Sequence, residues 1–178
     1  MSLRILLYLT TLLMLSASNA RADDIDIDPL RGAYIYHFLQ YITWAENSSN
    51  KNDMVVCALT SDPSVKHALS DVFSSEVDEP AFQIIFPMDD AQNQHKALSS
   101  CKLTYVASNE TQTYRRFANQ FSDSNVVVTE GDETYRGDIH LYVANGKLRF
   151  EIDRTSIHQK NTFKISSKLL RLSKRQQQ

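Results

Sequence analysis

The chain of 178 residues has few of the residues on which common enzyme signatures depend. Its four glycines, Gly32, Gly131, Gly137 and Gly146, are too scattered to form a phosphate-binding loop or a dinucleotide-binding fingerprint. It has no G-x-S-x-G element around a nucleophilic serine. None of its five histidines lies in an H-x-H or H-x-x-x-H pair that would predict a metal site. We therefore expect neither an enzyme nor a bound cofactor or metal.

The chain also lacks a strong excess of charge of either sign. Its formal net charge is −2 at pH 7, which gives no reason to expect nucleic acid or an anionic membrane as a partner. After the first 22 residues no stretch approaches the 18 apolar residues or so of a membrane-spanning helix. We expect the mature protein to be soluble and not membrane-spanning.

The first 22 residues have the pattern of a secretory signal peptide. Met1–Arg4 supplies one cationic side chain, and Ile5–Ala17 is an apolar run too short to span a bilayer. Small residues allow cleavage after Ala20 or Ala22, which leaves a single domain over residues 23–178. This segment contains no cysteine, which argues against a lipid anchor. We expect an exported protein.

The chain contains only two cysteines, Cys57 and Cys101. In an oxidising compartment they are expected to pair, and only one intramolecular pairing exists. The alternative is two buried thiols that pack as small hydrophobic residues. A disulfide closing a loop of about 45 residues stabilises a domain by about 4 kcal/mol in the chain-entropy treatment.

A helix is predicted over Leu30–Trp44, where apolar residues follow the 3.6-residue period. Apolar residues cover most of its faces and leave a narrow polar stripe of Gly32, Tyr36, Gln40 and Thr43. A helix of this kind is buried on most sides. We expect it to pack in the core on one face and against a second subunit on another, which predicts a homodimer.

Strands and helices alternate through the rest of the chain. The fold class predicted is α/β: a mainly parallel sheet with helices on both faces, ending in an antiparallel hairpin and a C-terminal helix. Asn145-Gly146 is a strong turn signal for that hairpin. Asp62, Asn109, Asp153 and Ser166 or Ser167 are candidate helix caps. The predicted strands are Met54–Leu59, Phe82–Phe86, Leu103–Ala107, Val126–Val128, Ile139–Val143 and Leu148–Ile152, and the later helices are centred on Val65–Phe73, Asp89–Ser100, Thr111–Phe121, Arg154–Lys160 and Ser167–Lys174.

Isolated polar residues have structural interpretations. We expect His37, on an apolar helix face, to be a hydrogen-bonded core histidine and His140 to point outward from a strand. Glu130, Asp132 and Glu133 cluster beside a glycine, which favours a solvated turn over a metal or sugar site.

Several segments in order resemble the YfiR-type family of periplasmic regulators. They are AYIYHFLQYITW from Ala33, VVCAL around Cys57, CKLTYV from Cys101, LRFEID from Leu148 and ISSKLLRL from Ile165. The resemblance covers nearly all of the mature chain. Two departures are visible. Residues 136–139 read RGDI where the family has a pattern like GGMI, which predicts a stiffer turn and a more polar local surface. A second cysteine pair known in some members is absent.

The resemblance implies a function in signalling. YfiR-like proteins bind the periplasmic sensor domain of a membrane diguanylate cyclase and hold it inactive, and release raises cyclic di-GMP and favours biofilm growth. The positions that match the family's receptor-binding patch are Glu151, Ile157 and, more loosely, Ile139. The alternative is structural: Glu151 as an outward strand residue and Ile157 as a core residue. Envelope redox state would act through Cys57 and Cys101 alone.

Two other classes of function remain open. A periplasmic small-molecule-binding module would use Tyr34, Tyr41 and Trp44 as an aromatic ligand wall. A thiol-active redox enzyme would prefer a closely spaced C-x-x-C pair, which this chain does not have.

Overall fold

Six strands form one large, mostly parallel sheet. In a computed structural model that describes residues 27–45, 54–75, 82–89, 94–131 and 135–173, the strand order is β3-β2-β4-β5-β6-β7. All neighbouring strands are parallel except β6 and β7, which form the expected antiparallel hairpin. The strands are β2 (Met54–Leu59), β3 (Phe82–Ile85), β4 (Cys101–Val106), β5 (Val126–Glu130), β6 (Ile139–Ala144) and β7 (Lys147–Ile152).

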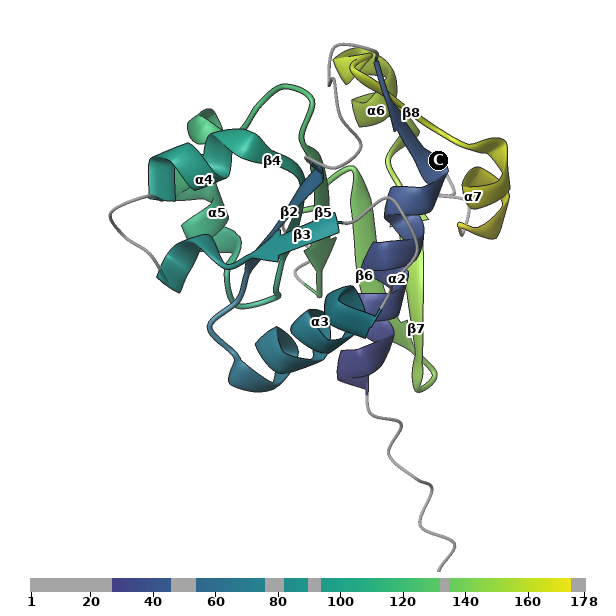
Figure 1. Cartoon of the computed structure of the whole chain (residues 1–178). Coiled ribbons are helices and arrows are strands. Elements are labelled where there is room, and N and C mark those ends of the chain that lie inside the picture. Colours follow the sequence, from purple (N-terminus) through teal and green to yellow (C-terminus); the bar gives the residue numbers. More distant parts are fainter. Residues whose placement is uncertain (1–26, 46–53, 76–81, 90–93, 132–134, 174–178) are drawn as a thin grey trace, which may run out of the picture.

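Helices cover both faces of this sheet (Figure 1), which confirms the predicted fold class. On one face, α2 (Ile27–Tyr41) and α3 (Pro63–Ser75) enclose the main core, to which β2 contributes Val56 and Ala58. On the other face, α4 (Gln94–Ser100) and α5 (Thr111–Phe117) cover a smaller core that contains Leu59. Alternate residues of one strand therefore enter different cores, as the pleat requires.

The two ends of the described chain meet in a small second sheet. The strand β1 (Ile42–Trp44) pairs antiparallel with β8 (Phe163–Ile165), which lies between α6 (Arg154–Lys160) and α7 (Ser167–Leu172). The indole Nε1 of Trp44 donates to the Ser124 carbonyl at 2.9 Å. The prediction of one helix as far as Trp44 is therefore wrong. Residues 42–44 form a strand because they pair with β8.

The predicted faces of α2 also need correction. Gly32 and Tyr36, expected in the outward polar stripe, are buried. A Cβ on Gly32 would lie 2.8 Å from the Val72 Cγ2 of α3, so glycine is needed for the two helices to approach. His37, expected in the core, is exposed together with Leu30. Since every face of this helix is rich in apolar residues, the period alone did not identify its buried side.

Several local predictions are confirmed. Asp62, Asp153 and Ser166 accept hydrogen bonds from backbone N–H groups in the first turns of α3, α6 and α7. Asn145 and Gly146 have φ values of 53° and 68°, which a type I′ hairpin turn requires.

Other boundaries differ from the prediction. Glu110, not Asn109, precedes α5, and it makes no side-chain cap. That helix ends at Phe117 and is followed by the 3-10 helix η4 (Ala118–Gln120). The segment predicted as one helix from Asp89 instead has a 3-10 helix, η3 (Pro87–Asp89), and then α4, with residues 90–93 outside the described ranges. The predicted signal peptide also lies outside those ranges. Among the helices that the structure does describe, none is long and apolar enough to traverse a bilayer.

Candidate functional site

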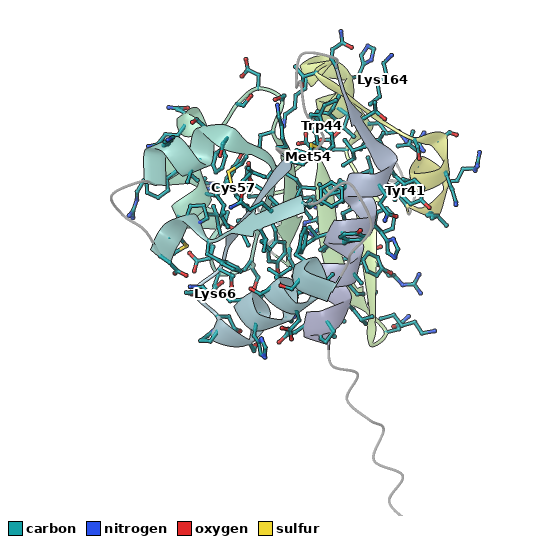
Figure 2. All side chains as sticks on the ribbon, in the orientation of Figure 1. Tyr41, Trp44, Met54, Cys57, Lys66 and Lys164 are labelled. Atoms are coloured by element: carbon teal, nitrogen blue, oxygen red, sulfur yellow. A yellow bond between two sulfur atoms is a disulfide. The ribbon has the colours of Figure 1, made fainter. Side chains whose placement is uncertain are left out.

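The two cysteines form a disulfide between two adjacent parallel strands of the large sheet. Cys57 lies within β2 and Cys101 begins the adjacent β4, with a Cα–Cα distance of 5.7 Å. Figure 2 shows the bond inside the molecule, and both residues are fully buried. The bond therefore joins β2, which pairs with the edge strand β3, to β4, which pairs with β5 on its other side.

The three residues matched to the family's receptor-binding patch lie in different environments. Ile139 is fully buried and pairs with Ile152 across the hairpin, so its assignment to a contact surface is corrected. Glu151 lies on β7, and its carboxylate accepts a 2.7 Å hydrogen bond from Arg136 Nη1. Ile157, on α6, is half-buried and packs against the main core. Glu151 and Ile157 thus lie on consecutive elements near the surface, and each also has a structural partner.

Glu130, expected in a solvated turn, is instead a buried acid at the end of β5. Its carboxylate accepts two hydrogen bonds from the Arg31 Nε, at 2.9 and 2.7 Å, and one from the Tyr105 hydroxyl at 2.5 Å. The hydrogen bond with Glu130 raises the pKa of Arg31. Burial, and then the Glu130 charge, raise the pKa of Tyr105 well above its usual value. Asp132 and Glu133, the other acids of the predicted turn, lie outside the described residues.

His140 is also buried rather than outward-facing. Only 2% of it is exposed, and its Nδ1 lies 3.0 Å from the Thr129 hydroxyl of β5. On β6 it lies on the opposite face from its neighbours Ile139 and Leu141, which belong to the main core. The prediction was wrong because that face is covered.

Asp138 connects α6 to the sheet. Its carboxylate accepts hydrogen bonds from the Val127 N–H at 2.8 Å, the Ser156 hydroxyl at 2.7 Å and the Lys160 ammonium at 2.6 Å. Only 1% of Asp138 is exposed, so of the two polar residues in RGDI only Arg136, which is exposed, makes the local surface more polar. The acid instead fixes the position of the helix that contains Ile157.

The aromatic residues proposed as a ligand wall are engaged in packing. Trp44 is buried and bonded to the Ser124 carbonyl. Tyr34 packs edge-on against Phe150, and its hydroxyl donates to the Leu148 carbonyl at 3.1 Å. The Lys168 ammonium of α7 lies 5.2 Å from the centre of the Tyr41 ring.

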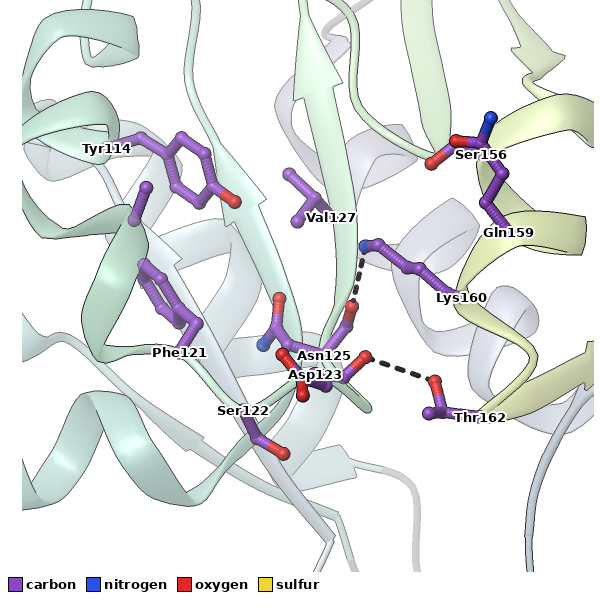
Figure 3. Close-up of a pocket in the computed structure, with 11 residues that line it drawn as sticks. Tyr114, Phe121, Ser122, Asp123, Asn125, Val127, Ser156, Gln159, Lys160 and Thr162 are labelled. Carbon is purple, nitrogen blue, oxygen red and sulfur yellow. Dashed lines mark hydrogen bonds between the residues drawn. The ribbon is translucent and has the colours of Figure 1, made fainter.

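A pocket of about 520 Å³ lies elsewhere, between α5–η4 and α6 (Figure 3). Tyr114, Phe121 and Asn125 line it on one side, and Gln159 and Lys160 of α6 on the other. Its volume is within the usual range for small-molecule sites. No sequence motif indicated this pocket, because its walls come from two stretches of the chain, residues 114–127 and 156–162, that are distant in sequence. In the part of the chain that the structure describes, no group of three or more histidine, cysteine or acidic side chains is placed to hold a metal ion.

Comparison with known proteins identifies the family. A family model described as YfiR/HmsC-like matches residues 28–174. No curated protein matches the chain in sequence. The matched region begins in the first turn of α2 and ends just beyond α7, so it includes every element of both sheets. The chain therefore belongs to the YfiR/HmsC-like family.

Proposed function

We propose that this protein is a periplasmic inhibitor of an inner-membrane diguanylate cyclase. It binds the periplasmic sensor domain of the cyclase and holds it in the inactive conformation, which limits cyclic di-GMP and biofilm formation. The observation that carries the proposal is the family match over residues 28–174, which spans the entire folded domain. Inhibition requires that the protein bind the inactive receptor more tightly than the active one, so that binding shifts the population.

We propose Glu151 and Ile157 as receptor contacts. Ile157 is half-buried on α6, and its remaining exposed surface supplies an apolar anchor. The Glu151 side chain is 13% exposed, and its ion pair with Arg136 holds the carboxylate in one orientation. An apolar side chain that becomes fully buried and a carboxylate that accepts a charge-assisted hydrogen bond can each contribute strongly to binding.

A near-isosteric substitution that removes only the negative charge tests the Glu151 contact with little disturbance of the fold. We expect Glu151→Gln to weaken binding to the purified sensor domain by about 2 kcal/mol, or about thirtyfold. Cyclic di-GMP in cells should then rise while the melting temperature of the purified variant stays within about 2 °C of wild type, as for a surface substitution.

Matched controls separate a binding role from a structural one. Arg136→Gln removes the same ion pair and leaves the Glu151 carboxylate in place. If Arg136→Gln and Glu151→Gln weaken binding equally, Glu151 acts only through that pair. For the helix, Ile157→Ala is compared with His158→Ala, an exposed neighbour on α6. The patch is assigned wrongly if Ile157→Ala stays folded and binds the sensor domain as wild type does.

A further inference from the structure

The pocket between α5–η4 and α6 contains a buried hydrogen-bond acceptor without a partner. Asn125 is 2% exposed, and its Nδ2 donates to the Cys101 carbonyl at 3.1 Å and to the Thr104 hydroxyl at 2.8 Å. These two bonds fix the orientation of the amide, and the Oδ1 has no hydrogen-bond partner among the residues that the structure describes. Figure 3 shows this oxygen directed into the space between Tyr114 and Val127. A buried acceptor is costly to leave unpaired, so the site favours a bound molecule that donates a hydrogen bond.

Lys160 supplies a donor on the opposite wall. Its ammonium donates to the Asn125 backbone carbonyl at 3.1 Å and to the Asp138 carboxylate at 2.6 Å. An ammonium carries three hydrogens, so these two bonds leave one for a molecule in the pocket. The pocket therefore presents one acceptor and one donor to a ligand.

The charges near the pocket disfavour an ionic ligand. The Lys160 charge is neutralised by Asp138, which lies behind the pocket wall, and the exposed Asp123 places a second carboxylate in the lining itself. An anion would approach two carboxylates. A cation would approach the Lys160 ammonium. Neutral groups that both donate and accept hydrogen bonds fit this arrangement, and hydroxyls are such groups.

The remaining wall is aromatic. The Tyr114 and Phe121 rings stack with their centroids 5.2 Å apart, and both line the pocket. The faces of aromatic rings carry partial negative charge and attract the polarised C–H groups of a ligand. An apolar wall with a few convergent polar groups is the usual composition of a small-molecule site.

We propose that this pocket binds a neutral, hydroxyl-rich ring of monosaccharide size, with one hydroxyl donating to Asn125 Oδ1 and another accepting from Lys160. The volume of about 520 Å³ accommodates such a ring. This ligand site is separate from receptor inhibition and does not depend on it. Because Ser156, Gln159 and Lys160 are residues of α6, the bound ring would contact the same helix as the proposed receptor contact Ile157.

Direct binding to the purified, oxidised protein tests the proposal. Saturation-transfer NMR and calorimetry are recorded with D-glucose, D-galactose and N-acetyl-D-glucosamine, and with glycine and acetate as ionic probes of similar or smaller size. We expect saturable binding of at least one sugar and none of glycine or acetate. Saturable binding of acetate or glycine without any sugar, or of none of the five compounds, overturns the proposal.

Two rim variants locate the binding. Ala118 is exposed and lines the pocket, whereas the neighbouring Asn119 is exposed and does not. We expect Ala118→Trp to fill the opening and weaken sugar binding at least about tenfold, the effect of losing one good hydrogen bond. Asn119→Trp should bind as wild type does. Equal affinity of all three proteins, at unchanged melting temperatures, would place the sugar elsewhere and contradict the assignment.

Discussion

The Arg31–Glu130 pair and the Tyr105 hydroxyl form a buried polar cluster in which the Glu130 carboxylate accepts hydrogen bonds from both other side chains. Arg31 is on α2, Tyr105 on β4 and Glu130 on β5, so the cluster joins the first helix to the carboxyl ends of two central strands. A buried carboxylate is tolerated because three hydrogen bonds and an opposite charge compensate for the water it has lost. Removal of any one member leaves the others partly unsatisfied.

The raised pKa of Tyr105 predicts a loss of stability at alkaline pH. Tyrosine in the unfolded chain releases its proton near pH 10, whereas burial beside Glu130 keeps Tyr105 protonated in the folded protein. The stabilisation is therefore complete below pH 10 and falls above it, by up to about 1.4 kcal/mol per pH unit.

The Tyr105→Phe variant isolates this contribution in urea unfolding. At pH 8 we expect it to be less stable than wild type by about 1–3 kcal/mol, because Glu130 loses a donor. Between pH 9 and 11 its free energy of unfolding should fall less steeply than that of wild type, so the two curves converge. Curves that remain parallel over that range would contradict the assignment.

Residue roles that depend on neighbours in sequence were predictable. Roles that depend on contacts with residues distant in sequence were not. Asp62, Asp153 and Ser166 cap helices that begin one residue later, so the signal is local. Glu130 and His140 looked solvent-facing because a strand pattern does not show which loop or helix covers its polar face. That information depends on segments distant in sequence.

Close packing at Gly137 illustrates the same limit. A Cβ at this position would lie 2.5 Å from the Val127 carbonyl oxygen, so the backbone approach to β5 excludes a side chain. This approach places the next residue, Asp138, where its carboxylate accepts the Val127 N–H. The sequence showed that Asp138 differs from the family pattern at this point, but it did not show that this acid is buried under α6.

At the scale of elements, the disulfide joins β2 to its neighbour β4 in the large sheet. We expect the double variant Cys57→Ala/Cys101→Ala to lose about 4 kcal/mol of the free energy of unfolding, since a loop with a sequence separation of 44 residues is no longer closed. Urea unfolding under oxidising and reducing conditions provides the measurement.

The reducing condition is also the control for this prediction. A thiol reductant should destabilise the wild-type protein to about the level of the double variant and leave the double variant unchanged. Equal midpoints for wild type and double variant in oxidising buffer would show that the bond does not stabilise the fold.

Elements with their own periodic pattern were predictable, and the elements that exist only by pairing were not. The strands of the large sheet and α3 were recognised from apolar runs and cap residues. The strand β1 was assigned to the preceding helix because its three residues continue the helical period. Its extended form depends on β8, which no local signal near Ile42 indicates.

At the scale of the whole molecule, the outer side of α2 has apolar surface that its own subunit covers only in part. Leu30 is 36% exposed, and on the same helix Ala33, Tyr34 and Tyr41 are half-buried. Apolar groups gathered on one exposed helix face are typical of an interface. We expect a homodimer in which this face of α2 contributes.

Substitution of one interface residue tests the assembly. In analytical ultracentrifugation at micromolar concentration, we expect the wild-type protein to sediment as a dimer and Leu30→Lys as a monomer. Gln112→Lys adds the same charge to an exposed position of α5, on the opposite face of the sheet, and should remain dimeric. A monomeric wild-type protein would show that α2 only covers the core of its own subunit.

The pairing of β1 with β8 also affects the order in which parts of the domain can fold during synthesis. Trp44 is made early and its partner Phe163 is made 119 residues later, near the end of the chain. At about 5–20 residues per second, synthesis separates the two by about 6–24 s. During that interval the edge of β1 and the indole of Trp44 lack the strand that will cover them. The strand β1, made near the start of the domain, is thus among the last elements to be completed, and a chain that stops before residue 163 leaves it permanently unpaired.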